Sequence, residues 1–359
     1  MLRSRELLRE LVAHPSVAGR PNAELAAKLE QRLRATGAEV SSIPGGEHTN
    51  LWATIGPAGV PGLVLSAHMD VVSVEGQSWT SDPFALTERG SRLAGRGTAD
   101  MKGFLAAAVV AFEDAARGGS LSSQLHLSLS TDEEIGCVGI AQLVPWIAGL
   151  DPLPAGCVVG EPTGMRAVTA HKGKVAGRVT VSGTAVHSAL APLGVNAVEE
   201  AARLIVRLRE RADRLIAGSP SDDRFQVPTA TFTTGPIRGG TVLNVVPDTC
   251  VFEFEVRHLP GQDPAPLLEG IEYEPLAGYP GLDVPPDAEI VGLVRAAGAE
   301  EGGTVSFGTE AGVFAALGIP AVVCGPGDIA DAHRADESVE LEQLERCEVF
   351  LGRLVDAMR

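Results

Sequence analysis

Short apolar runs that end in polar residues recur along the first half of the chain. Residues 125–129 place leucine at every second position, and three successive acids follow at 132–134. This alternation predicts a strand with one apolar face. Residues 62–67 form a similar run that leads into His68, and residues 157–163 form another that contains an acid. Runs of this length are typical of the buried strands of a parallel sheet.

Leucines spaced three or four residues apart predict amphipathic helices between these strands. An early helix is expected to begin after Asn22 as its N-cap and to stop at Gly37. Other elements predicted near the two ends of the chain are strands at 39–43, 50–55, 304–307 and 321–324, and helices at 104–116, 288–298, 310–317 and from about 341. Strands and helices that alternate in this way favour an α/β fold with a doubly wound, mostly parallel sheet.

The middle of the chain has a different pattern. The elements predicted there are strands at 175–182, 229–234 and 250–257 around a long charged helix at 196–217. Asn196 and Glu199 have the spacing of a capping box at the start of this helix. We therefore expect a small ferredoxin-like α+β domain at 172–282, inserted into an α/β domain formed by 1–171 and 283–359.

Charge and composition exclude several classes of function. The 359 residues include 29 basic and 46 acidic side chains, a formal net charge of -17. So acidic a chain is unsuited to nucleic acid or to an anionic membrane surface. No run approaches the ~18 apolar residues of a membrane span, and the first residues do not form the apolar core of a signal peptide.

The cysteines also bear on function. The five cysteines are scattered and include no Cys-x-x-Cys pair. They indicate neither a disulfide framework nor a thiolate zinc site. A reducing cytoplasm is therefore the expected location.

Five potential metal ligands lie where strands end or where loops lead into helices. They are His68, Asp100, Glu134, Glu161 and His333. Open α/β sheets bind their ligands at the carboxyl ends of the strands. Histidine and carboxylate ligands without cysteine suit zinc or related divalent ions, and a carboxylate shared by two ions is typical of two-metal hydrolases. We therefore expect a site for two divalent ions.

Two further acids are candidates beside these ligands. Asp70 lies two residues after His68, a spacing that lets it orient the imidazole. Neighbouring side chains of an extended chain point in opposite directions, so one of Glu133 and Glu134 can bind metal while the other carries a proton. The alternative for each residue alone is a core or surface role, and for the acid run a solvated turn. The glycine-rich loop 95–103 lacks the Gly-Lys-Ser/Thr ending of a phosphate-binding loop.

Five motifs together resemble the co-catalytic zinc aminoacylase and carboxypeptidase family over nearly the whole chain. The motifs are Ser66-Ala67-His68-Met69-Asp70, the Gly95 to Gly103 loop, Thr131-Asp132-Glu133-Glu134-Ile135-Gly136, Gly160-Glu161-Pro162-Thr163 and Ala332-His333. Within the family, the segments Phe307 to Gly312 and Cys324 to Ile329 are more similar to the acetylornithine deacetylase branch than to the desuccinylase branch.

The resemblance implies a role for each candidate in the site. It implies that Asp100 bridges two zinc ions, with His68 and Glu161 on one ion, Glu134 and His333 on the other, and Glu133 as general base. It also implies a cis peptide between Asp100 and Met101. Cobalt is the alternative to zinc.

The resemblance further implies a substrate pocket and a lid. Glu310 and Gly312 correspond to part of the pocket, and Asn244 and Arg257 to lid positions that meet the substrate carboxylate. His187 resembles a lid histidine that reaches the partner's metal site in related dimers, so residues 172–282 are expected to form a homodimer. One departure is the segment 261–270, where relatives have a full helix and only a turn or two fits.

The expected activity is metal-dependent hydrolysis of the amide bond of an N-acyl amino acid, N-acetylornithine first, in arginine biosynthesis. The alternatives within this class are succinyl-diaminopimelate desuccinylase and a dipeptidase-like relative. A binding protein without catalysis on the same fold is the alternative from another class. Retention of Glu133 with all five ligands argues against it.

Overall fold

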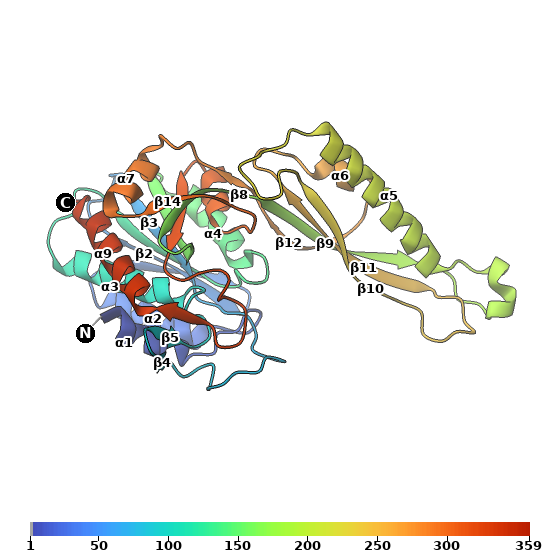
Figure 1. The fold of residues 1–359 in the computed structure, drawn as a ribbon, viewed down its shortest axis with the longest axis horizontal. Coiled ribbons are helices and arrows are strands. Elements are labelled where there is room, and N and C mark those ends of the chain that lie inside the picture. The colour runs from blue at the N-terminus through green and yellow to red at the C-terminus, as the bar shows by residue number, and fades with distance from the viewer. Residues whose placement is uncertain (1–2) are drawn as a thin grey trace. The chain divides into compact units, whose positions relative to one another are not determined.

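A computed structural model describes residues 3–359 of the chain (Figure 1). Its contacts divide the chain into two compact units. The large unit contains the described residues up to Ala170, with Leu282–Thr304 and Thr309–Arg359. The small unit contains His171–Gly281 and Val305–Gly308. Within the described residues, no helix is long and apolar enough to cross a membrane.

A mixed sheet with a parallel centre organises the large unit. Its strand order is β1-β2-β6-β3-β7-β15-β8-β13, with β14 paired to β8. The strands are β1 (Glu39–Gly45), β2 (His48–Ile55), β3 (Leu63–His68), β6 (Leu125–Ser130), β7 (Gly156–Pro162), β8 (Arg166–His171), β13 (Leu282–Asp283), β14 (Glu300–Val305) and β15 (Ala321–Gly325). Strands β6, β3, β7 and β15 run parallel. Every residue of these four strands is buried, as the apolar runs predicted.

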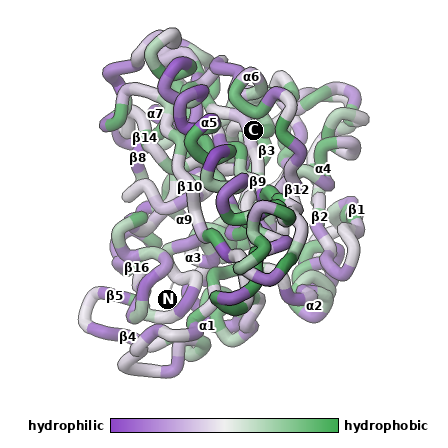
Figure 2. The backbone as a smooth tube through the Cα atoms, turned by 90° about the vertical axis from the view of Figure 1, so that its right-hand side faces the viewer, coloured by the Kyte–Doolittle hydropathy of each residue, from purple (hydrophilic) through white to green (hydrophobic). Residues whose placement is uncertain are grey.

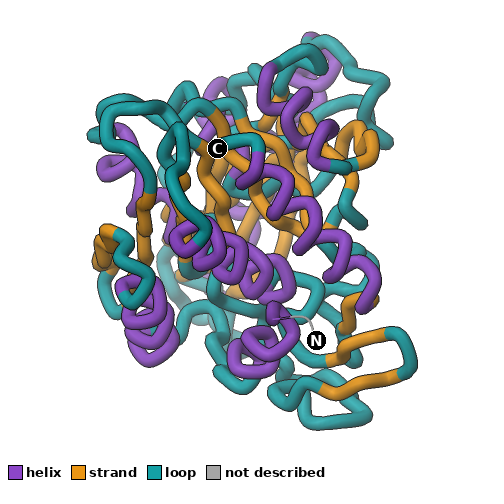
Figure 3. Tube along the Cα trace, turned by 90° about the vertical axis from the view of Figure 1, so that its left-hand side faces the viewer, coloured by secondary structure: helices purple, strands orange, loops and turns teal. Residues whose placement is uncertain are grey.

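Helices pack on this sheet and on one another. They are α1 (Arg3–Val12), α2 (Ala23–Arg34), α3 (Lys102–Arg117), α4 (Val138–Ala148), α7 (Glu289–Ala297), α8 (Ala311–Ala316) and α9 (Leu341–Asp356). Helix α3 contacts β3, β6 and β7 and is itself packed against α1 and α9, while α8 contacts β7 and β15. Figure 3 shows helices in front of the sheet strands. The doubly wound, mostly parallel α/β fold is therefore confirmed.

A separate three-stranded sheet adjoins the loops that contain Asp100 and His333. It consists of β4 (Thr87–Arg89), β5 (Arg92–Ala94) and β16 (Ser338–Glu340) in the order β16-β5-β4. Both neighbouring pairs are antiparallel. The pairing joins two segments that are more than 240 residues apart in sequence.

The small unit has one four-stranded antiparallel sheet and one long helix. The strands, in the order β10-β11-β9-β12, are β9 (Gly173–Ser182), β10 (Thr231–Gly239), β11 (Thr249–His258) and β12 (Glu274–Tyr279). Helix α5 (Ala197–Gly218) interleaves hydrophilic and hydrophobic residues (Figure 2) and packs its buried residues on Phe252 and Phe254 of β11. Helix α6 (Ala265–Leu268) is a single turn, which agrees with the short segment noted in the sequence. A short 3₁₀ helix, η1 (Ser188–Leu193), precedes α5.

Two expectations about local structure need correction. The strand predicted at 304–307 is wrong in extent, because β14 runs from Glu300 to Val305. Two glycines lie in the middle of β14, which pairs with β8, and Glu300 N donates to Met165 O at 3.1 Å. Tertiary pairing therefore outweighs the low strand propensity of glycine. Asn22 precedes α2, but its side chain makes no cap and instead hydrogen-bonds both the N–H and the carbonyl of Thr49.

The start of α5 follows the expected chemistry more closely. The side chain of Asn196 accepts hydrogen bonds from Val198 N at 3.0 Å and Glu199 N at 3.3 Å. Glu199 accepts from the Asn196 side chain rather than from its backbone N–H, so only half of a capping box forms.

Candidate active site

Parallel pairing brings the ends of two strands together. His68 is the last residue of β3, Glu161 is near the end of β7, and these strands are adjacent. Glycine is required at position 160, because a Cβ there would lie 1.9 Å from the ring of Phe104 in α3. Since side chains alternate along a strand, close packing of α3 at Gly160 directs Glu161 to the opposite face of the sheet.

The remaining ligand candidates come from loops. Asp100 lies in the loop before α3, Glu134 follows β6, and His333 lies between β15 and β16. His333 has a φ of 61°, in the left-handed region that side chains other than glycine seldom adopt. Such backbone conformations are frequent at functional sites.

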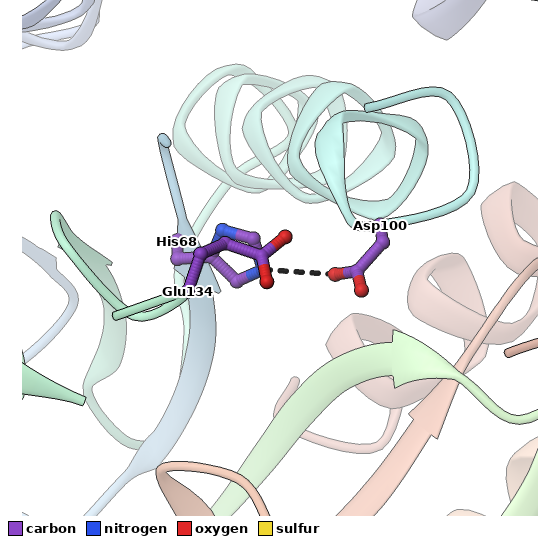
Figure 4. Close-up of side chains that lie close together, drawn as sticks. All are labelled: His68, Asp100 and Glu134. Carbon is purple, nitrogen blue, oxygen red and sulfur yellow. Dashed lines mark hydrogen bonds and ion pairs between the residues drawn. The ribbon is translucent and has the colours of Figure 1, made fainter. Parts of the chain in front are cut away.

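The five side chains meet in one cluster. His68 Nε2 lies 2.9 Å from Asp100 Oδ1 and 3.8 Å from Glu161 Oε1. His333 Nε2 lies 3.1 Å from Asp100 Oδ2 and 2.9 Å from Glu134 Oε2. The two carboxylate oxygens of Asp100 thus face two different histidines. Figure 4 shows His68, Asp100 and Glu134, which come from three separate segments.

The chemistry of the cluster fits divalent cations. Possible ligand atoms of His68, Asp100 and Glu134 lie within 4.8 Å of one another, as do those of His68, Glu133 and Glu161. Oε1 of Glu134 is buried and has no hydrogen-bond partner among the described residues. Burial and the nearby Asp100 raise the pKa of Glu134 to about 8 and that of Glu161 well above its usual value. Buried carboxylates so crowded need positive charge to remain ionised, and metal ions supply it.

Asp70 contacts two parts of the cluster. Nδ1 of His68 donates to the backbone carbonyl of Asp70 at 3.0 Å, while the Asp70 carboxylate is 3.5 Å away. The carboxylate accepts hydrogen bonds from the backbone N–H groups of Glu133 and Glu134, both at 3.2 Å. Asp70 therefore links the His68 strand to the acidic loop, a wider role than its spacing indicated.

Cys137 is a neighbour of Glu133 that the sequence reasoning missed. Its buried thiol donates to Glu133 Oε1 at 3.1 Å. Burial raises the pKa of Glu133, so this carboxyl holds a proton more readily than an exposed one. The four-residue spacing between Glu133 and Cys137 was the available signal, but only the tight turn after β6 brings the two side chains into contact.

Two predicted pocket residues lie in the large unit. Glu310 is 1% exposed, and its Oε2 accepts a hydrogen bond from Ser66 of β3 at 3.2 Å. Burial raises the pKa of Glu310 to about 7. Gly312 is buried in the first turn of α8. Ser66 is two residues before His68 on the same strand, so Glu310 lies on the same face of the sheet.

The other predicted site residues lie in the small unit. His187 and Asn244 are exposed and occupy adjoining segments, where Ser188 N donates to Asn244 O at 2.9 Å. The His187 ring accepts from Ala189 N at 3.1 Å. Arg257 of β11 donates to Glu255 and, at 2.7 Å, to the hydroxyl of Tyr279. The structure thus pairs His187 with Asn244 and places Arg257 within the sheet of the same unit.

Comparison with known proteins gives consistent matches. Residues 64–357 match the family model for peptidase family M20/M25/M40. An acetylornithine deacetylase from Myxococcus xanthus is 38% identical over 374 residues, covering 98% of this chain and 96% of that protein. One from Proteus mirabilis (strain HI4320) is 32% identical over 379 residues, covering 98% and 95%. An M20 family metallo-carboxypeptidase from Sulfolobus solfataricus shares the fold, with a TM-score of 0.82, 19% identity and 99% coverage of both chains.

Proposed function

The chain belongs to peptidase family M20/M25/M40 and is a metal-dependent hydrolase, and from this premise we propose that it hydrolyses N-acetylornithine to ornithine and acetate. The observation that carries the proposal is that two histidines and three carboxylates lie close together beside Glu133. The choice of substrate follows the full-length similarity to the Myxococcus xanthus deacetylase. Release of ornithine would serve arginine biosynthesis.

We propose a specific ligand set for two divalent ions. Asp100 would be the ligand shared by both ions, since its two oxygens face different histidines. His68 and Glu161 would complete one site, and Glu134 and His333 would complete the other. Zinc is the proposed metal and cobalt the alternative, because the donors are imidazole and carboxylate without thiolate. When bound, the ions would polarise the substrate carbonyl and acidify water.

Glu133 is the proposed proton carrier. Its carboxylate accepts a proton from the water that attacks the amide carbonyl, and it returns a proton to the leaving amine as the C–N bond breaks. The elevated pKa of Glu133 suits a group that must hold this proton between the two steps. Cys137 and Asp70 support this role, since the thiol contacts the carboxylate and Asp70 holds the backbone of the loop.

We further propose that 1–171 and 283–359 form the catalytic domain and 172–282 a lid and dimerisation domain. His187 would donate to the developing oxyanion in the partner subunit, with Asn244 and Arg257 meeting the substrate carboxylate and Glu310 and Gly312 lining the pocket. An exposed apolar surface on the small unit supports association of two copies: Leu193 is 74% exposed and Leu243 fully exposed. The two residues belong to the segments next to His187 and Asn244.

The proposed location is the cytoplasm, with a small N-acyl amino acid as the partner molecule and no nucleic acid or membrane. All five cysteines are buried and free, which is compatible with a reducing compartment. The net charge of -17 disfavours polyanions.

A substrate panel tests the proposed activity. We expect kcat/KM to be highest for N-acetylornithine, compared with N-succinyl-diaminopimelate and an unmodified dipeptide. Activity should vanish after removal of metal by a chelator and return with Zn²⁺ or Co²⁺, which also compares the two metals. Preference for the succinylated substrate or the dipeptide would replace the proposed substrate, and metal-loaded protein without amidase activity would indicate a binding protein.

A further inference from the structure

The loops that carry Asp100 and His333 are joined beside the cluster by the three-stranded sheet. Strand β5 leads into the Asp100 loop, β16 follows the His333 loop, and Ser338 pairs with Ala94. The sheet therefore aligns Glu337, just before β16, with the backbone that follows β5. Gly95 N donates to Glu337 O at 2.9 Å, which extends the pairing by one bond.

The carboxylate of Glu337 holds the backbone of the Asp100 loop. Its Oε1 accepts hydrogen bonds from Ala99 N at 2.9 Å and Asp100 N at 3.0 Å. Its Oε2 accepts from Arg96 Nη1 at 2.6 Å. The side chains of Arg96 and Glu337 are each 1% exposed, so this ion pair is shielded from water.

Arg96 continues the contacts to the backbone of His333. Its Nη2 donates to Gln77 Oε1 at 2.5 Å, and Gln77 Nε2 donates to the backbone carbonyl of His333 at 3.0 Å. The Arg96 guanidinium also lies 5.0 Å from the ring centre of Trp79. A continuous set of contacts thus runs from the backbone N–H of Asp100 to the backbone carbonyl of His333.

The loop that contains Gln77 also contacts the segment after His333 at a second position, Asp336. Thr80 donates from its N–H at 3.1 Å and its hydroxyl at 3.0 Å to the carboxylate of Asp336. His333 needs such support, because its side chain is 48% exposed and its φ of 61° is unusual. Among the proposed ligands, His333 has the most exposed side chain.

We propose that Gln77, Arg96 and Glu337 are positioning residues that couple the two metal sites, with Gln77 tuning the affinity of the site formed by Glu134 and His333. Glu337 holds the backbone of Asp100, which both sites share, whereas Gln77 donates directly to the backbone of His333 and is linked to Asp100 through Arg96 and Glu337. The inference rests on the ligand set proposed above. Residues that orient ligands from outside typically change metal affinity 10–100-fold when they are removed.

The test is metal titration of the full-length protein after chelation. Co²⁺ binding, followed by visible absorption, is compared for the wild type, Gln77→Ala and the matched control Gln262→Ala. Gln262, like Gln77, is partly buried, but its amide donates to the Ser219 hydroxyl in the small unit. We expect Gln77→Ala to weaken one of the two binding steps ~10–100-fold and leave the other unchanged, with the control like the wild type.

The thermal midpoint of the metal-free protein separates positioning from folding. Gln77→Ala should leave this midpoint close to that of the wild type, since Gln77 is only partly buried. Two unchanged binding steps, or equal weakening of both steps together with a lowered midpoint, would overturn the inference. Glu337→Gln, which retains shape but loses charge, should weaken both steps because Asp100 is shared, and weakening of one step alone would contradict the coupling.

A separate variant distinguishes failure of the inference from failure of the ligand set. His333→Ala should abolish one binding step entirely. If His333→Ala still binds two ions with wild-type affinity, the ligand set itself is wrong. If His333→Ala loses one ion while Gln77→Ala retains two wild-type steps, the ligand set stands and the positioning role of Gln77 is wrong.

Discussion

The candidate residues of the large unit and those of the small unit are held in different ways. His68, Asp100 and Glu161 are at most 5% exposed, and neighbouring strands and loops hold them from several directions. His187 and Asn244 are exposed, and among the described residues their contacts come from adjoining segments of the small unit.

This difference distinguishes a group of residues that is already assembled in one unit from residues that need a further surface to complete a site. In the large unit, the proposed ligands converge within one compact unit, so we expect ion binding to need little rearrangement. In the small unit, His187 is exposed, so its proposed catalytic role requires that another surface cover it. We therefore expect changes in the large unit to act within one subunit, and the change at His187 to depend on the partner subunit.

The largest effect should come from Glu133→Gln. The amide cannot accept the proton, so turnover should fall ~10²–10⁴-fold, the usual contribution of a general base. Metal content should remain at two ions, measured by elemental analysis alongside steady-state rates. Glu345→Gln, at an exposed position of α9, is the matched control and should keep full activity. Loss of metal from Glu133→Gln would exchange the proposed roles of Glu133 and Glu134.

His187→Ala should have the next largest effect. Loss of one oxyanion donor costs ~10²–10³-fold in kcat, with metal content unchanged. Mixing His187→Ala subunits with inactive Glu133→Gln subunits tests whether the histidine acts across the proposed dimer. A hybrid has one site with both an intact Glu133 and a His187 from the partner, so activity should reappear. Mixtures no more active than their parents, despite subunit exchange measured by native mass spectrometry, would contradict action in the partner subunit.

The smallest effect concerns stability of the large unit at low pH. His126 of β6 is 3% exposed, and burial lowers its pKa to about 4 from a usual value of 6.5. The unfolded chain therefore binds more protons than the folded chain between pH 6.5 and about 4. Unfolding free energy should consequently fall as pH drops through this window, by about 3 kcal/mol for this group.

Tryptophan fluorescence can measure this pH effect, because Trp52, Trp79 and Trp146 all lie in the large unit. Urea unfolding of the metal-free protein at pH 7 and pH 4.5 should show a smaller loss in His126→Gln than in the wild type. His187→Gln, which changes an exposed histidine, should retain the wild-type pH dependence. Equal losses in the wild type and His126→Gln would exclude His126 as the source.

Sequence periodicity was a good guide to the large unit. The apolar runs identified β3, β6, β7 and β15, since strands buried on both faces tolerate few polar residues. The family resemblance is confirmed, and the cis peptide between Asp100 and Met101 that it implied is present. Periodicity failed at β14, where glycines occupy a strand because β8 supplies the pairing partner.

The sequence of residues along the chain determined which residue types lie at the strand ends, and therefore which chemistry this protein can perform. The tertiary structure alone decided which oxygen of Asp100 faces which histidine, because those distances depend on where two loops and the end of β3 meet. It also decided the contacts of Arg96 and Glu337, which are 241 positions apart in the chain. A buried charge is stabilised by a partner that is close in three dimensions, and the spacing of two residues along the sequence does not determine the distance between them.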